Sequence, residues 1–121
     1  MKDLYAQPDL VLGIKAATTF TIDLTKSLGS GETLETISGT DSYGNVLGAS
    51  VSDAELSYDT PVINTGTVTS TRTGDTIAIG KAIQIRLIGK ECRPGKDYVL
   101  TIVVTTTNDD TIQVMQKITA V

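Results

Sequence analysis

The last third of the chain carries a strict two-residue hydrophobic period, and this feature limits the fold more than any other. Apolar residues take alternate positions in 83–87, and the period returns in 98–104 and 111–118. Because successive side chains of a β-strand point to opposite faces of a sheet, the period predicts strands with one face on a core and one in water. Residues 108–110, Asn-Asp-Asp, predict a hairpin turn between the last two strands, since Asn and Asp tolerate left-handed geometry.

Weaker strand signals run through the rest of the chain. Residues 18–24 alternate, with Phe20, Ile22 and Leu24 expected to face inward. Further strands or strand-like segments are expected at 32–38, 46–51, 54–58 and 76–80. The Thr- and Gly-rich segment 62–74 fits either a flat edge hairpin or a loop. About seven or eight short strands without a helical period predict an antiparallel β-sandwich.

Tyr98 stands at the start of the predicted strand 98–104, directly after the turn residues 93–97. Immunoglobulin-like sandwiches keep a Tyr at this corner, and its hydroxyl bonds to nearby backbone. The sequence therefore predicts an all-β, immunoglobulin-like antiparallel β-sandwich with Tyr98 as a structural residue. Residues 14–121 are assigned to the sandwich. Residues 1–13 are expected to be either an N-terminal arm or an edge strand, because Pro8 interrupts pairing.

Composition limits the partners and the environment. A length of 121 residues indicates one domain, and the formal charge of −4 comes without a basic cluster, which argues against nucleic acid. Cys92 is the only cysteine, so no internal disulfide is expected. The apolar run 10–14 is far shorter than the roughly 20 residues that cross a bilayer, and acidic Asp3 and Asp9 flank it. We therefore expect no membrane partner and synthesis in the cytosol.

The residues that carry most enzyme chemistry are scarce. The chain contains no His, which removes the commonest general base and metal ligand, and Cys92 has no such base to activate it. The carboxylates Asp53, Glu55 and Asp59, or the pair Asp109 and Asp110, could bind a cation or act as acid and base, but the spacing of neither set matches a calcium loop. The sequence predicts a protein that is not an enzyme and that has no catalytic residue, metal or cofactor.

Two groups of apolar residues are predicted to form interfaces. The first consists of residues in the outward register of late strands, which would form an exposed patch. These residues are Ile88, Val99, Val103 and Met115. The second is the N-terminal segment, which is too apolar for a solvated tail and could reach over a neighbouring chain. Its candidates are Leu4, Tyr5, Pro8, Leu10, Val11 and Leu12, and the alternative is that Leu10 to Ile14 form the first strand of the sandwich.

Three segments carry a resemblance to a known family. They are 8–12 followed by 20–24, the Leu-Gly-Ser-Gly-Glu-Thr-Leu turn at 28–34, and 95–101 continuing into 104–107. Together they resemble the small immunoglobulin-like fibre-tail adaptor proteins of tailed bacteriophages. That family shows an Asp-rich start, a Leu-Gly-x-Gly-Asp/Glu-Thr turn and a late strand that ends in a Thr-Thr pair. This chain departs from it at Leu24 and Leu28, where aromatic residues are common, and in the unmatched region from about residue 40 to 80.

The resemblance implies a virion structural protein that joins tail and fibre or appendage proteins through protein–protein contacts. It implies other virion proteins of the tail, fibre or capsid as partners, a homo-oligomer in the particle, and assembly in the host cytoplasm. Proteins of this build also serve as capsid decoration proteins, and the sequence leaves both open. A third possibility is a carbohydrate-binding or adhesion module, for which Tyr5, Tyr43 and Tyr58 would be the available stacking residues.

Overall fold

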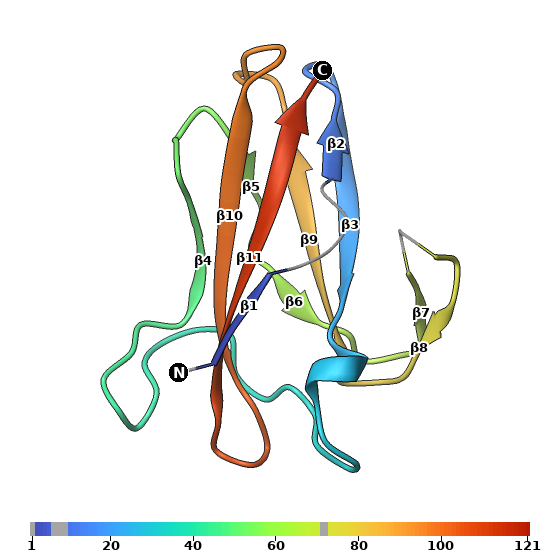
Figure 1. The fold of residues 1–121 in the computed structure, drawn as a ribbon, viewed down its shortest axis with the longest axis vertical. Coiled ribbons are helices and arrows are strands. Elements are labelled where there is room, and N and C mark those ends of the chain that lie inside the picture. The colour runs from blue at the N-terminus through green and yellow to red at the C-terminus, as the bar shows by residue number, and fades with distance from the viewer. Residues whose placement is uncertain (1, 6–9, 71–72) are drawn as a thin grey trace.

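The computed structural model describes residues 2–5, 10–70 and 73–121, with only the backbone of 2–5, and these residues form an all-β fold (Figure 1). They contain eleven strands and one three-residue 3₁₀ helix. The elements are β1 Lys2–Tyr5, β2 Leu10–Leu12, β3 Ala17–Asp23, η1 Thr25–Ser27, β4 Gly48–Val51, β5 Ser57–Tyr58, β6 Val62–Ile63, β7 Val68–Thr69, β8 Thr76–Ile77, β9 Ala82–Ile88, β10 Asp97–Thr105 and β11 Thr111–Ala120. No helix among the described residues is long and apolar enough to cross a membrane.

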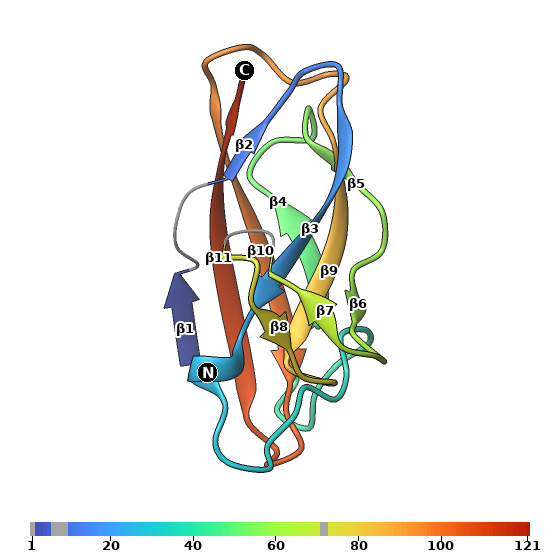
Figure 2. The same ribbon diagram turned by 90° about the vertical axis from the view of Figure 1, so that its right-hand side faces the viewer.

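Two sheets face each other, as the two side views show (Figures 1 and 2). The first sheet has the order β1-β11-β10-β4, and β2 also pairs with β11. In the second sheet the central strand β9 pairs with β3 and with the short strands β5 and β6. A separate hairpin of β7 and β8 projects beside the second sheet. The coarse prediction of a sandwich-like all-β chain is therefore confirmed.

The core lies between the two sheets and is built mainly from branched aliphatic residues. Ile83, Ile85 and Leu87 of β9 are each no more than 1% exposed, and Leu100 and Ile102 of β10 are fully buried. Alternate residues of these strands face out, so the two-residue period predicted for the last third is correct. Burial of such side chains supplies most of the driving force for folding, about 1.5–3 kcal/mol for each large one.

The hairpin of β10 and β11 is the longest pairing in the fold. It runs without interruption from Asp97 opposite Thr119 to Thr105 opposite Thr111. The predicted turn closes it, and Asp109 adopts a left-handed conformation with φ of 61°. Asp is one of the few non-glycine residues that tolerate this conformation, which explains why the turn could be read from the sequence.

The prediction of a strand over 32–38 is wrong. The Leu34 N–H donates to the Gly80 carbonyl, whereas the Glu35 N–H donates to the Thr105 carbonyl, so neighbouring residues bond to different parts of the fold. Beyond an isolated bridge between Leu34 and Thr106, the segment joins no ladder. It crosses from the side of the second sheet to the first, and Leu34 is buried on the way.

The N-terminal segment pairs with its own chain. Both β1 and β2 run parallel to β11, with Lys2 opposite Ile112 and Leu10 opposite Ile118. Leu12 is 1% exposed and belongs to the core. The described parts of residues 1–13 therefore extend the edge of the first sheet in their own chain.

Candidate functional site

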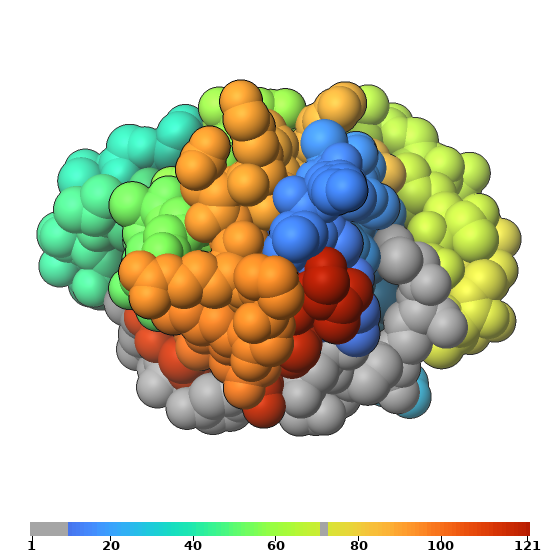
Figure 3. Space-filling view, turned by 90° about the horizontal axis from the view of Figure 1, so that it is seen from above, coloured from blue at the N-terminus to red at the C-terminus, as the bar shows by residue number. Residues whose placement is uncertain are grey.

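Two loops meet at one end of the molecule, the end seen from above in Figure 3. Loop 52–56 joins β4 to β5, and loop 89–96 joins β9 to β10. The β2–β3 turn lies beside them, because the Gly89 N–H donates to the Ala16 carbonyl over 2.9 Å. The chain's last residues also lie here, since the Ile14 N–H donates to the Val121 carbonyl over 3.0 Å. This arrangement brings the main charged cluster of the fold together.

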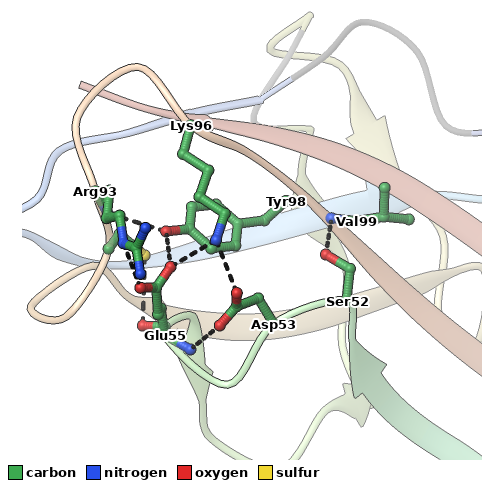
Figure 4. Close-up of polar contacts among 8 residues, drawn as sticks. Ser52, Asp53, Glu55, Arg93, Lys96, Tyr98 and Val99 are labelled. Carbon is green, nitrogen blue, oxygen red and sulfur yellow. Dashed lines mark hydrogen bonds and ion pairs between the residues drawn. The ribbon is translucent and has the colours of Figure 1, made fainter.

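The charged cluster consists of Asp53, Glu55, Arg93, Lys96 and Tyr98, and we refer to it as the Tyr98 cluster (Figure 4). The Lys96 ammonium donates to Asp53 Oδ2 at 2.7 Å and to Glu55 Oε1 at 2.8 Å. The Arg93 Nε donates to Glu55 Oε2 at 2.6 Å. Each carboxylate is therefore bound by at least one cation of the opposite loop.

Tyr98 links this cluster to the backbone. Its side chain is fully buried, and its hydroxyl accepts a hydrogen bond from the Arg93 N–H at 2.9 Å. The same hydroxyl donates to Glu55 Oε1 at 2.9 Å. The Lys96 ammonium also lies 5.2 Å from the centre of the Tyr98 ring, within the range of a cation–π contact. Tyr98 thus has the geometry of a tyrosine corner, with the hydroxyl bonded a few residues upstream.

The charges of the cluster stabilise one another. The hydrogen bond from Lys96 is the main cause that lowers the pKa of Asp53 and of Glu55 below their usual values. The bonds to Asp53 and then Glu55 raise the pKa of Lys96. All three groups therefore remain ionised at neutral pH, and the ammonium is not available as a neutral nucleophile.

The three carboxylates that were considered as cation ligands or as an acid and a base do not lie together. These residues are Asp53, Glu55 and Asp59. Lys96 occupies the space between Asp53 and Glu55, whereas Asp59 pairs with Arg86 at 3.9 Å. No group of three or more potential metal ligands occurs among the described residues. Cys92 is buried beside the cluster, and burial raises the pKa of its thiol, which disfavours the reactive thiolate.

The outer face of the first sheet carries three of the predicted interface residues. Val99 and Val103 point outward from β10, and Val99 is 40% exposed. Met115 of β11 stands opposite Thr101 on the same face and is half-buried. We call Val99, Val103 and Met115 the outer apolar patch. It is small and is interrupted by Thr, Gln and Lys side chains.

Ile88 does not belong to this patch. It lies on β9 in the second sheet, opposite Ala17 and Ser57, so the prediction that it adjoins Val99 and Val103 on neighbouring strands is wrong. The chain changes sheet between β9 and β10, and consecutive strands therefore face opposite sides of the molecule.

The N-terminal candidates fall into three groups. Leu12 is buried, and half-buried Leu10 packs against the core, so neither offers itself to a partner in this fold. Among the candidates whose side chains are described, Val11 is 60% exposed and is the one that presents an apolar side chain. Leu4 and Tyr5 lie on β1, of which only the backbone is described, and Pro8 lies outside the described residues.

Five exposed large apolar residues among those described were not predicted as interface residues, namely Tyr43, Val46, Val62, Ile79 and Val121. Tyr43 is 71% and Val46 74% exposed, and both lie in the loop before β4. The turn residues at 41–45 predicted the loop, but no local pattern indicates which of its side chains face water. Tyr58, by contrast, packs against the core and donates its hydroxyl hydrogen to the Ala49 carbonyl at 2.8 Å, so it offers no stacking platform for a sugar.

The chain matches no protein-family model, no curated protein and no solved structure. Its function is therefore inferred from its own geometry and from the family resemblance of segments at both ends of the chain.

Proposed function

We propose that this protein is a non-enzymatic structural component of a tailed-bacteriophage particle, built on an immunoglobulin-like β-sandwich. It acts as an adaptor that joins tail and fibre or appendage proteins through protein–protein contacts. The alternative within the same class is a capsid decoration protein. In both cases other virion proteins are the partners and the protein functions through its shape.

Three features support an immunoglobulin-like sandwich. The strand order places β11 and β10 at the centre of one sheet and β9 at the centre of the other. The N-terminal strands run parallel to the last strand, and Tyr98 makes a backbone bond at the corner before β10. These features agree with the family resemblance, which rests on segments at both ends of the chain.

One observation carries the proposal that the protein works by contact. The Tyr98 cluster binds its own charges in internal ion pairs, whereas apolar side chains remain exposed on the outer sheet face and in the loops. Exposed apolar side chains gain free energy when a partner covers them, at about 25 cal/mol for each Å² removed from water. Such surfaces favour assembly.

Immunogold electron microscopy of purified particles tests this proposal and separates its two forms. Label at the tail supports the adaptor, and label spread over the head supports the decoration protein. Particles that carry no label, from a preparation in which the antibody recognises the free protein, would contradict both forms.

A further inference from the structure

The loop of residues 39–47, which we call the Tyr43 loop, is held in one conformation by the Asp41 carboxylate. Asp41 Oδ1 accepts hydrogen bonds from the Tyr43 N–H at 2.9 Å and the Asn45 N–H at 2.8 Å. Asp41 Oδ2 accepts from Asn45 Nδ2 at 2.7 Å and from the Thr111 hydroxyl. Together these bonds lower the pKa of Asp41, with the bond from Thr111 as the largest cause. The loop is therefore ordered and tied to β11.

This ordered loop presents apolar side chains to water. Tyr43 and Val46 are the two most exposed large apolar residues among those described. Leu47, at the end of the loop, is buried and only 7% exposed. The Tyr43 hydroxyl donates a hydrogen bond to Asp109 Oδ2 at 3.3 Å. Neither Tyr43 nor Val46 contributes to the core, so polar side chains would serve the fold equally well.

The surroundings of the loop are acidic. Residues 32–47 and 106–111 contain five carboxylates and neither Lys nor Arg. The Lys81 ammonium reaches the start of the first segment, where it donates to the Glu32 backbone carbonyl at 2.6 Å. The two segments lie at the same end of the molecule (Figure 1). Glu35, Asp109 and Asp110 are exposed, and within the described part of the chain none of the three forms an ion pair. Unneutralised carboxylates at close range attract a positively charged surface and repel a negative one.

We propose that the Tyr43 loop is a protein-binding loop that inserts Tyr43 and Val46 into an apolar recess bordered by Lys or Arg residues on a different protein of the particle. The proposal rests on the proposed function, since an adaptor needs a second contact surface besides the outer apolar patch. An aromatic anchor in a preformed loop loses little conformational entropy on binding, which is typical of residues that dominate binding energy.

Charge favours a different protein over a second copy. The chain carries a formal net charge of −4, so a second copy is itself acidic. Of its exposed cations, Lys26, Arg86 and Lys117 lie elsewhere on the fold, with Arg86 beside Asp59 and Lys117 beside Asp97. Lys15 and Lys90 lie at the end opposite the loop, together with Glu91. The other two cations there, Arg93 and Lys96, are bound by Glu55 and Asp53. A second copy therefore offers the acidic loop little surplus positive charge.

Photo-cross-linking within assembled particles tests this inference. The variant Tyr43→p-benzoylphenylalanine is incorporated into particles, and a Val62→p-benzoylphenylalanine variant, whose site on β6 is 52% exposed, is the matched control. We expect position 43 to cross-link to a Lys- or Arg-containing peptide of another virion protein, and position 62 not to reach that peptide. Cross-links only between copies of this chain, the same peptide from both positions, or no cross-link at position 43 would overturn the inference.

A pair of variants separates this inference from the proposed function. The double variant Tyr43→Ser/Val46→Ser should keep the urea midpoint of the wild type, because both residues are exposed, and should fall at least about tenfold in copies per particle. The control Val62→Ser should enter particles normally. If the wild-type chain is present and the double variant enters at the same level, this inference alone fails. If the wild-type chain is absent from particles, the proposed function fails with it.

Discussion

At the scale of single residues, Gly89 determines how two loops pack together at the end of the molecule that carries the Tyr98 cluster. A Cβ on Gly89 would collide with the Gly13 carbonyl oxygen and would lie 3.3 Å from Ile14 Cα. Both contacted atoms belong to the backbone, which cannot move away as the end of a flexible side chain could. Gly89 is therefore required by close packing of the β9–β10 loop on the β2–β3 turn.

We predict that Gly89→Ala destabilises the fold by about 1–3 kcal/mol, the usual cost of overpacking. Gly66→Ala is the matched control, because an added Cβ there meets no heavy atom within 4 Å, and its effect should stay within about 0.5 kcal/mol. Urea denaturation of both variants measures the difference. Equal midpoints for the two variants would show that the loops are not packed as described.

The ion pairs of the Tyr98 cluster predict how stability depends on pH. Folding lowers the pKa of Asp53 and Glu55 from ordinary values of 3.8 and 4.5, so their contribution is present above those values and is lost as pH falls through the lowered values. Folding raises the pKa of Lys96 from 10.5, so its contribution is present below that value and is lost as pH rises through the raised one. Stability from this cluster should be level between these limits.

The variant Lys96→Met tests this dependence, because Lys96 is the main cause of both lowered carboxyl pKa values. We expect the urea midpoint of the wild type to fall more steeply below about pH 4 than that of the variant. Arg86, which pairs with Asp59 at 3.9 Å between exposed side chains, supplies the control Arg86→Met with a nearly unchanged profile. Parallel profiles for the wild type and Lys96→Met would refute this account of the cluster.

At the scale of elements, the two N-terminal strands contribute differently to the stability of the fold. β1 adds four residues to the edge of β11, whereas β2 brings the buried Leu12 into the core. The Leu12 carbonyl also accepts a hydrogen bond from the Val121 N–H at 3.0 Å. The segment therefore divides into an added edge strand and a strand on which the core depends.

We predict that deletion of residues 1–9 leaves the domain folded with a modest loss of stability. Deletion of residues 1–12 should cost more, because the loss of the Leu12 side chain alone removes about 2–5 kcal/mol. Circular dichroism during urea denaturation of the two truncated chains gives the comparison. Equal stability of both would mean that Leu12 is not part of the core.

At the scale of the whole molecule, the sequence predicted the sandwich best where strands are long and alternate strictly. The strands 83–87, 98–104 and 111–118 could be predicted because their period is local. The crossing segment 32–38 could not, since Leu34 and Ile37 stand three residues apart and its hydrogen bonds reach distant parts of the chain. The Tyr98 cluster was missed as a unit because Lys96 and Asp53 are 43 positions apart in the sequence.

The predicted interface shows the same limit. Alternation identified Val99 and Val103 as outward residues, but it could not tell that Ile88 faces out from the other sheet. Tyr43 lies in a loop whose conformation depends on the hydrogen bonds of Asp41, and one of these comes from Thr111, 70 positions from Asp41 in the sequence. Which outward side chains share one surface depends on which of the two sheets each strand joins. A local sequence pattern does not determine this assignment.

The copy number of this chain in purified particles, measured by quantitative mass spectrometry against the major capsid protein, tests the central claim most directly. A structural component must be present in a fixed number that does not change between preparations, with a small ring multiple for an adaptor and a lattice-scaled number for a decoration protein. We predict such a fixed number. A chain that is abundant in the infected cell and absent from the particles would contradict the account.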